Sequence, residues 1–336
     1  MYEKIILLFL LVNFPIVCFF NQLVHLININ DRPDNVRKLH KKDVPLFGGI
    51  LIIYNLSIFL IADFFLDLNI LQEISSKREY LAFIIGVLFL FFIGIFDDKY
   101  NLSANKKLIL NFFILLFLTL LDDNLVVKKL TFSFIENPIY LNNFSHLFTI
   151  LCILLFINAI NMFDGINLQT GTYCIIIFTI FIFKDIYVFV SVILICTLIL
   201  FLFYNFSNKI FLGDSGTHIL AFLISYILIK SYNFNLAFTV EEIFIILSFP
   251  GLDMFRLFVI RVFKGKNPFS PDRNHIHHLI QKKFNKFQTF LIIQSCIILN
   301  IVIYYIIVNK LVVLFLTIFT YLALYIIFYN KGKSIE

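Results

Sequence analysis

Five polar segments interrupt a strongly apolar chain, and they hold the carboxylates, amides and imidazoles whose spacing could do chemistry. They run from Asp31 to Gly49, from Asp97 to Lys107, from Asn158 to Gly171, from Phe206 to Gly216 and from Arg261 to His278. Carboxylate and amide oxygens are suitable ligands for a hard cation such as Mg²⁺. Histidine and arginine side chains donate hydrogen bonds to phosphate oxygens. Together these residue types predict one composite site that handles phosphate groups with the help of a metal ion.

The pair Asp97-Asp98 closes an apolar run and has no cation immediately before it. Carboxylates at the C-terminal end of a helix oppose the helix dipole, so this placement costs stability. A pair that binds a metal ion or accepts a proton would explain why the cost is tolerated. A solvated helix end is the alternative interpretation.

Asn158, Asn161 and Asp164 recur at every third residue in the segment N-A-I-N-M-F-D-G. At a helix end, this spacing places their side-chain oxygens along one side, where they would suit a hard cation. Hydrogen bonding between membrane helices remains the alternative role for the two asparagines.

Asp214 lies between Gly213 and Gly216, just before another apolar run. Glycines let the backbone approach a ligand closely, and the amides of a following helix N-terminus can face an anion. We therefore expect Asp214 to be the principal magnesium ligand. A turn and helix cap formed with Ser215 is the alternative.

The segment D-R-N-H-I-H-H holds Arg273, His275, His277 and His278. Neither thiolates nor H-x-x-x-H spacing accompany the histidines, which argues against a zinc site. Phosphate binding is favoured instead, with stabilisation of the charge that develops during phosphoryl transfer. A basic patch that touches lipid headgroups is the alternative.

The elements that must position these segments are membrane-spanning helices. Of the 336 residues, 60% are hydrophobic and only 14% are charged, and the mean hydropathy is +0.94. Apolar runs of about 17 to 25 residues recur, each long enough to cross the bilayer as a helix. The expected spans are Ile5 to Ile27, Gly49 to Leu66, Tyr80 to Phe96, Leu108 to Leu121, Leu147 to Phe163, Leu168 to Phe183, Ile186 to Phe206, Thr217 to Ile229, Ile243 to Phe263, Phe290 to Val308 and Leu311 to Phe328. The sequence predicts an all-α, polytopic membrane bundle of about 10 to 11 transmembrane helices, as a single domain over residues 1–336.

Lysine and arginine concentrate in one set of alternate loops, and all five polar segments lie in that set. Cytoplasmic loops retain such residues, so we expect these segments to form a site at the cytoplasmic face, with the N-terminus facing outward. The net charge of +6 reflects this topology and attraction to anionic headgroups. It does not indicate binding to nucleic acid.

Taken in order, the five segments resemble the polyprenyl-phosphate N-acetylhexosamine-1-phosphate transferases of glycosyltransferase family 4, from about Asp31 to His278. The resemblance implies a multi-pass protein of the bacterial inner membrane that joins undecaprenyl phosphate to the sugar phosphate of a UDP-amino sugar and releases UMP. It implies a requirement for Mg²⁺, for which Mn²⁺ could substitute. Membrane lipid is a further expected partner, and a homodimer is left open.

The resemblance also implies roles for individual residues. Those expected to be catalytic are Asp97, Asp98, Asp164, His275, His277 and His278, and those expected at the metal are Asp214 and Asn161. We further expect substrate contacts from Lys107, Asn158, Arg273, Arg37 and His40. One departure from the family pattern is Asn167, which stands where a second aspartate is common.

The H-x-H-H form after Asp-Arg resembles the branch that initiates O-antigen, common-antigen or teichoic-acid chains. The alternative is the peptidoglycan branch, which uses a UDP-muramoyl-pentapeptide and usually has three consecutive histidines. An alternative from another class is a secondary transporter, which predicts polar residues near helix midpoints. The apolar run from Ile243 to Phe263 is interrupted by Pro250-Gly251, with the polar residues Asp253 and Arg256 close behind.

Overall fold

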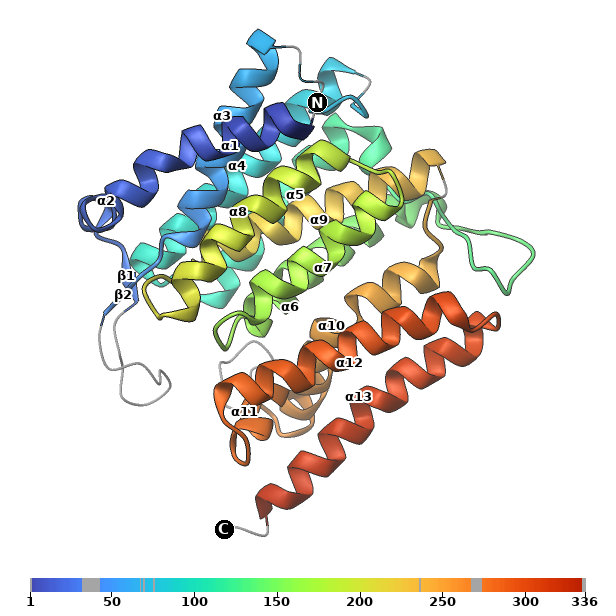
Figure 1. The fold of residues 1–336 in the computed structure, drawn as a ribbon. Helices are drawn as coiled ribbons and strands as arrows, with labels where there is room; N and C mark the ends of the chain where they lie inside the picture. Colours follow the sequence, from blue (N-terminus) through green and yellow to red (C-terminus); the bar gives the residue numbers. More distant parts are fainter. Residues whose placement is uncertain are drawn as a thin grey trace. The chain divides into compact units, whose positions relative to one another are not determined.

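The computed structural model describes residues 2–31, 43–66, 68, 70–74, 76–235, 237–266 and 274–333. These residues are mainly α-helical, with two pairs of two-residue strands and two short 3-10 helices, Asp123–Leu125 and Asn142–Phe144 (Figure 1). The helices are α1 (Tyr2–Cys18), α2 (Phe20–Ile27), α3 (Gly48–Leu66), α4 (Lys77–Tyr100), α5 (Ala104–Leu121), α6 (Ser145–Phe163), α7 (Gln169–Phe183), α8 (Val188–Phe206), α9 (Gly213–Asn235), α10 (Val240–Phe263), α11 (Ile276–Gln281), α12 (Lys286–Ile306) and α13 (Lys310–Lys333). The strands pair antiparallel, β1 (Asn30–Asp31) with β2 (Val44–Pro45) and β3 (Lys129–Leu130) with β4 (Ile139–Tyr140).

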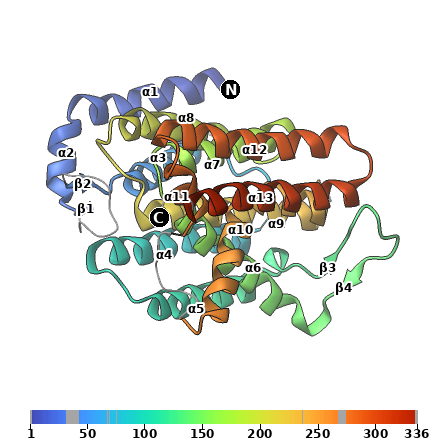
Figure 2. The same ribbon diagram turned by 90° about the horizontal axis from the view of Figure 1, so that it is seen from below.

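Within the described ranges, eight helices are long and apolar enough to cross a membrane, namely α3, α4, α5, α6, α8, α10, α12 and α13. The pair α1 and α2 passes the same test as one broken span, with a bend of 74° between the helices (Figure 2). Each of the eleven spans expected from the sequence coincides with a helix or, for the first, with this bent pair. The predicted fold class, a polytopic membrane helical bundle, is confirmed.

Two of the expected spans differ from the others. Helix α7 has only 15 residues, and α9 includes Asp214 and Lys230 within its length. Every residue from Ile219 to Ile227, in the middle of α9, is nevertheless buried. A helix that is apolar all round and enclosed by neighbours is typical of the interior of a bundle.

The chain divides into two compact units. Unit 1 contains Met1–Ile114 and Thr170–Ile227, and unit 2 contains Leu115–Gln169 and Leu228–Glu336. Each unit therefore combines two separated stretches of the sequence.

Helix α3 is held on two sides in unit 1. It packs against α8 (Figure 1) and is joined to α1 by a reciprocal pair of amide hydrogen bonds. Asn13 Nδ2 donates to Asn55 Oδ1 at 2.6 Å, and Asn55 Nδ2 donates to Asn13 Oδ1 at 3.1 Å. Both side chains are buried, so each satisfies a polar group that lipid could not.

The segment before α3 pairs with the segment before α9, also in unit 1. Phe211 N donates to Pro45 O, Gly48 N donates to Phe211 O, and Gly49 N donates to Leu212 O, at 2.9 to 3.0 Å. These backbone hydrogen bonds fix the start of α9 beside the start of α3. Backbone hydrogen bonds alone therefore fix the position of Asp214 in the folded chain.

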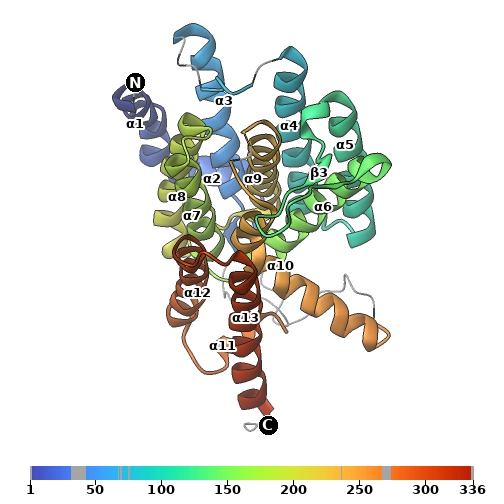
Figure 3. The same cartoon turned by 90° about the vertical axis from the view of Figure 1, so that its right-hand side faces the viewer.

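In unit 2, α10 packs against α6, α12 and α13. Figure 3 shows α12 and α13 side by side, with the short α11 in contact with both. The β3–β4 hairpin, visible in Figure 2, is anchored by Tyr232, whose hydroxyl donates to Lys129 O at 2.9 Å and accepts from Thr131 N at 2.7 Å. Nearby, Lys230 Nζ lies 2.9 Å from Asp122 Oδ2, and both side chains are 1% exposed.

Candidate active site

The end of α4 holds Asp97 inside the protein. Asn101 adopts a left-handed conformation with φ of 49°, and its N–H donates to Asp97 O at 2.8 Å, which terminates the helix. Asparagine tolerates this conformation better than most residues. The chain then turns back, so that Leu102 N donates to Asp97 Oδ1 at 2.7 Å. Asp97 is therefore fixed in orientation although it ends a membrane helix.

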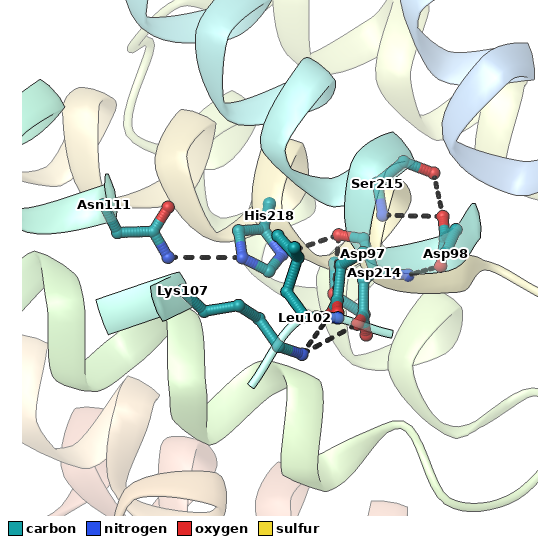
Figure 4. A network of polar contacts seen from close by, with 9 residues as sticks. Asp97, Asp98, Leu102, Lys107, Asn111, Asp214, Ser215 and His218 are labelled. Carbon is teal, nitrogen blue, oxygen red and sulfur yellow. Dashed lines mark hydrogen bonds and ion pairs between the residues drawn. The ribbon is translucent and has the colours of Figure 1, made fainter. Parts of the chain in front are cut away.

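Lys107 joins two carboxylates from distant parts of the sequence (Figure 4). Its ammonium group forms an ion pair with Asp97 Oδ2 and lies 3.0 Å from Asp214 Oδ2. Asp97 is almost fully buried, whereas the Asp214 and Lys107 side chains are 26% and 23% exposed. The cluster therefore has an accessible side, formed by Asp214 and Lys107.

Asp98 has a different task from its neighbour. Its Oδ1 accepts from Asp214 N at 2.7 Å, while its Oδ2 accepts from Ser215 N at 3.1 Å and from Ser215 Oγ at 2.8 Å. These are the first amides of α9, which have no partner within their own helix. Asp98 thus caps α9 from α4, and a carboxylate at a helix N-terminus is also favoured by the helix dipole.

Small residues allow α3 and α4 to approach the first turn of α9. A Cβ atom on Gly94 would lie 2.3 Å from Ser215 Cα, and one on Gly49 would lie 2.3 Å from Ser215 Oγ. Gly213 has φ of +76°, a conformation that favours glycine. The spacing G-D-S-G therefore serves close backbone contact as well as the placement of Asp214.

Two further side chains support the cluster. His218 Nδ1 lies 2.6 Å from Asp214 O, and its Nε2 lies 3.3 Å from Asn111 Nδ2. Both residues are buried, at 2% exposure. They link the first turn of α9 to α5.

The chemistry of this cluster suits a divalent cation. The carboxylates of Asp97 and Asp214 flank the ammonium group of Lys107, and a third carboxylate, from Asp98, accepts the Asp214 N–H. In the described part of the chain, no group of three or more His, Cys, Asp or Glu side chains is arranged so that it could hold a metal ion by itself. Magnesium typically uses one or two protein carboxylates and takes its other ligands from water and substrate phosphates, so a sparse donor set fits it.

The second group of predicted residues lies in unit 2. Asn158 and Asn161 are on α6, and Asn158 Nδ2 donates to Leu154 O at 2.7 Å. Asp164 is the residue that ends α6, where its N–H donates to Ile160 O at 3.1 Å. A Cβ atom on Gly165 would lie 2.0 Å from His277 Nε2, so only glycine lets the histidine pack against this turn.

The three histidines form a compact group at the start of α11. The His275 and His277 rings are nearly parallel, with centroids 5.5 Å apart, and the His277 and His278 centroids are 4.2 Å apart. His277 is 1% exposed, and its Nδ1 is a buried atom without a hydrogen-bond partner. Burial lowers the pKa of His277 well below its usual value, and the neighbouring His278 and His275 lower it further.

The structure thus assembles the predicted residues into two groups. Unit 1 contains Asp97, Asp98, Lys107 and Asp214, which are in contact with one another. Unit 2 contains Asn158, Asn161, Asp164, His275, His277 and His278, with His277 against the turn that follows Asp164. Arg37, His40 and Arg273 lie outside the described residues.

Several residues around these groups were not predicted from the sequence. Asn111 follows Lys107 by one helical turn and His218 follows Asp214 by one turn, so helical spacing could have indicated both. Asp253 stands out in the sequence only as a polar residue beside the break at Pro250-Gly251, yet its carboxylate lies 2.9 Å from His275 Nδ1.

Comparison with known proteins gives a consistent result. The model of the family described as glycosyl transferase family 4 matches residues 80–232, a range that includes Asp97, Asp98, Asp164 and Asp214. A probable undecaprenyl-phosphate N-acetylglucosaminyl 1-phosphate transferase of Bacillus subtilis (strain 168) is 31% identical over 257 residues, which cover 74% of this chain and 68% of that protein.

Two further relatives are similar over a longer stretch. The undecaprenyl-phosphate alpha-N-acetylglucosaminyl 1-phosphate transferase of Yersinia pestis is 30% identical over 282 residues, covering 80% of this chain and 73% of that protein. The protein of the same description from Escherichia coli (strain K12) is 29% identical with the same coverage.

Proposed function

Because this chain belongs to glycosyl transferase family 4, we propose that it transfers N-acetylhexosamine 1-phosphate from a UDP-sugar to undecaprenyl phosphate and releases UMP. The relatives are named for undecaprenyl phosphate and for N-acetylglucosaminyl 1-phosphate, which supports this acceptor and an amino sugar. The observation that carries the proposal is the cluster of Asp97, Lys107 and Asp214 around the capped start of α9. The product would begin a cell-surface polysaccharide.

The reaction needs little covalent chemistry from the protein. An oxygen of the lipid phosphate attacks the β-phosphorus of the UDP-sugar, and the bond to the UMP oxygen breaks as UMP leaves with the electron pair. Catalysis is then mainly positioning and neutralisation of charge. Asp97 is the better candidate to orient the lipid phosphate, because Asp98 is occupied by three donors from α9.

Asp214 would hold magnesium. Asn161, which belongs to unit 2, stays a metal ligand predicted from the sequence alone. When bound, the ion would neutralise charge on the nucleotide diphosphate. Lys107 adds a fixed positive charge beside the accessible carboxylate of Asp214. The histidine group, with the unpartnered Nδ1 of His277, would donate to the phosphates of the departing UMP.

The site would face the cytoplasm from the inner membrane, since the basic loops flank it. The buried charged groups of unit 2 do not favour the transporter alternative. Asp253 pairs with Arg256, and Asp122 pairs with Lys230. These charges are neutralised within the protein and have no need of a transported ion.

The test is release of UMP by the purified protein, measured across a panel of UDP-sugars with and without undecaprenyl phosphate. We expect release from a UDP-N-acetylhexosamine that depends on both the lipid and Mg²⁺ and stops when EDTA is added. Asp214→Ala should abolish it. Release that continues without the lipid would contradict the proposal and indicate a hydrolase.

The matched control is Asp63→Asn. Asp63 is also a carboxylate of unit 1, but its Oδ1 accepts only the Ile70 N–H among the contacts described here, at 3.2 Å. Its substitution should leave UMP release close to that of the wild type. Full activity of Asp214→Ala would refute the metal role while leaving the reaction class intact.

A further inference from the structure

The Asp253 carboxylate has four polar contacts, from Tyr321, Arg256, Ile276 and His275. On α10, its Oδ1 accepts from Tyr321 Oη at 2.8 Å, from Arg256 Nη2 at 2.8 Å and from Ile276 N at 3.1 Å. Its Oδ2 faces His275 Nδ1 at 2.9 Å. Two of these four contacts are to the histidine segment, and the residue is 3% exposed.

Arg256 braces the same segment from a second direction. Its Nη2 donates to Asn274 O at 2.7 Å, and its Nε donates to Tyr321 Oη at 2.8 Å. The guanidinium group also lies 4.4 Å from the centre of the Tyr325 ring, one turn further along α13. Residues 274 to 276 are thus held by one carboxylate and one guanidinium, both on α10.

The contact with Asp253 assigns the hydrogen on the His275 ring. A carboxylate that is paired with arginine accepts hydrogen bonds and does not donate them. The hydrogen between the two groups must therefore be on His275 Nδ1, which leaves Nε2 as the ring nitrogen that can meet a substrate. A partner of this kind sets both the tautomer and the direction of an imidazole.

We propose that Asp253 is a positioning residue for phosphosugar transfer, which holds His275 so that its Nε2 faces the nucleotide phosphate. Nε2 donates to that phosphate in the form of the ring that carries a hydrogen on both nitrogens. The proposal rests on the function proposed above for the histidine group. Arg256 and Tyr321 keep the Asp253 carboxylate in place, and Asp253 touches no substrate itself.

The competing explanation is that Asp253 only stabilises the fold. A second buried carboxylate of the same unit, Asp122, allows the two explanations to be compared. Asp122 is likewise buried within unit 2 and neutralised by Lys230, but no histidine contacts it among the described residues. If Asp253 only balanced a buried charge, removing it would resemble removing Asp122. The two carboxylates therefore serve as a matched pair.

The experiment is a double-mutant cycle with Asp253→Asn and His275→Asn in the purified full-length protein. Asparagine at position 275 keeps a donor where Nδ1 lies and removes Nε2. We expect each single variant to lower kcat about 10- to 100-fold, with a smaller change in KM for the UDP-sugar. Because Asp253 acts through His275, the double variant should match His275→Asn alone.

Asp122→Asn is the control, alone and with His275→Asn. It should lower the thermal midpoint while leaving kcat per folded molecule near the wild-type value in both backgrounds. If turnover of the His275 variants is too low to measure, the same cycle is run on the affinity for radiolabelled UMP. If Asp253→Asn fails to fold, Arg256→Gln takes its place in the cycle. Arg256→Gln should lower kcat by a smaller factor, and it should not lower kcat further when combined with His275→Asn.

Losses that multiply in the double variant, or a fall in thermal midpoint without a fall in kcat, would overturn the proposal. Failure of the wild type to release UMP with undecaprenyl phosphate would instead refute the proposed function. The two failures are therefore distinguishable in one set of assays.

Discussion

Asp97 and Asp98 are neighbouring carboxylates with different partners. The sequence indicates an acidic pair but gives no way to rank its members, because the partners of Asp98 come from residues more than a hundred positions away. In the folded chain, Asp97 faces Lys107, while Asp98 receives the first amides of α9. The residue types of the site could be predicted from the sequence, but the different roles of Asp97 and Asp98 could not.

This division predicts unequal effects of the same substitution. Asp98→Asn keeps an oxygen for the Asp214 amide, so activity should fall no more than about 10-fold. Asp97→Asn removes the carboxylate that faces Lys107 and should lower activity by at least about 100-fold. Rates of UMP release for the two purified variants check this. Equal losses would mean that the two aspartates act as a unit.

The burial of the His277 ring should make the stability of the folded protein depend on pH. In the unfolded chain a histidine titrates near pH 6.5, whereas burial lowers the pKa of His277 well below that value in the folded protein. Between these two pKa values the unfolded state binds more protons. The contribution of His277 is therefore intact above about pH 6.5 and is lost as the pH falls further, by at most about 1.4 kcal/mol per pH unit.

The measurement is the thermal midpoint of the purified protein at several pH values between 7.5 and 5.5. The wild type should lose stability toward pH 5.5 more steeply than His277→Gln, which has no group that titrates in this range. Parallel curves for the two proteins would contradict the assignment.

At the scale of elements, apolar run length predicted the helices, and it did so because backbone groups in lipid must be satisfied within the helix. Run length does not predict which helices meet. The start of α9 lies against Gly49 of α3 and Gly94 of α4, a contact that depends on backbone hydrogen bonds between residues 45–49 and 211–212. Similarly, capping of α9 by Asp98 and of α11 by Asp253 comes from other helices, so no local pattern marks it.

The first turn of α9 lies so close to Gly94 that even a methyl group at this position should lower stability and activity. In Gly94→Ala the new methyl group would lie 2.3 Å from Ser215 Cα, and backbone cannot move aside as a side chain can. We expect a loss of about 1 to 3 kcal/mol in unfolding free energy and a displaced Asp214, with reduced activity. Thermal midpoints and UMP release measure both effects.

Gly251 provides the control for this substitution. It also lies inside a membrane helix, but a Cβ atom there would meet nothing within 4 Å. Gly251→Ala should be neutral or stabilising by up to about 1 kcal/mol, as is usual for alanine in a helix interior. If Gly94→Ala proved as stable as Gly251→Ala, the contact between α4 and α9 would be in doubt.

At the scale of the whole molecule, composition alone predicted a polytopic membrane bundle, and the helices confirm it. The proposed orientation places the loops after α4 and α10 in the cytoplasm and the β3–β4 hairpin outside. Lys99→Cys and Lys282→Cys should therefore react with an impermeant maleimide in inverted vesicles, and Glu136→Cys in right-side-out vesicles, each in a cysteine-free background. Labelling of Lys99→Cys and Lys282→Cys from opposite faces would exclude a shared site.

The central claim is that a phosphosugar, not a sugar alone, moves to the lipid. It is tested by supplying UDP-N-acetylglucosamine labelled with ³²P at the β-phosphorus, together with undecaprenyl phosphate and Mg²⁺, and separating the lipid and aqueous phases. The account predicts that the label enters the lipid phase in step with the UMP that appears in water, and that Asp214→Ala abolishes both. Label that remains in water as UDP while sugar reaches the lipid would contradict it.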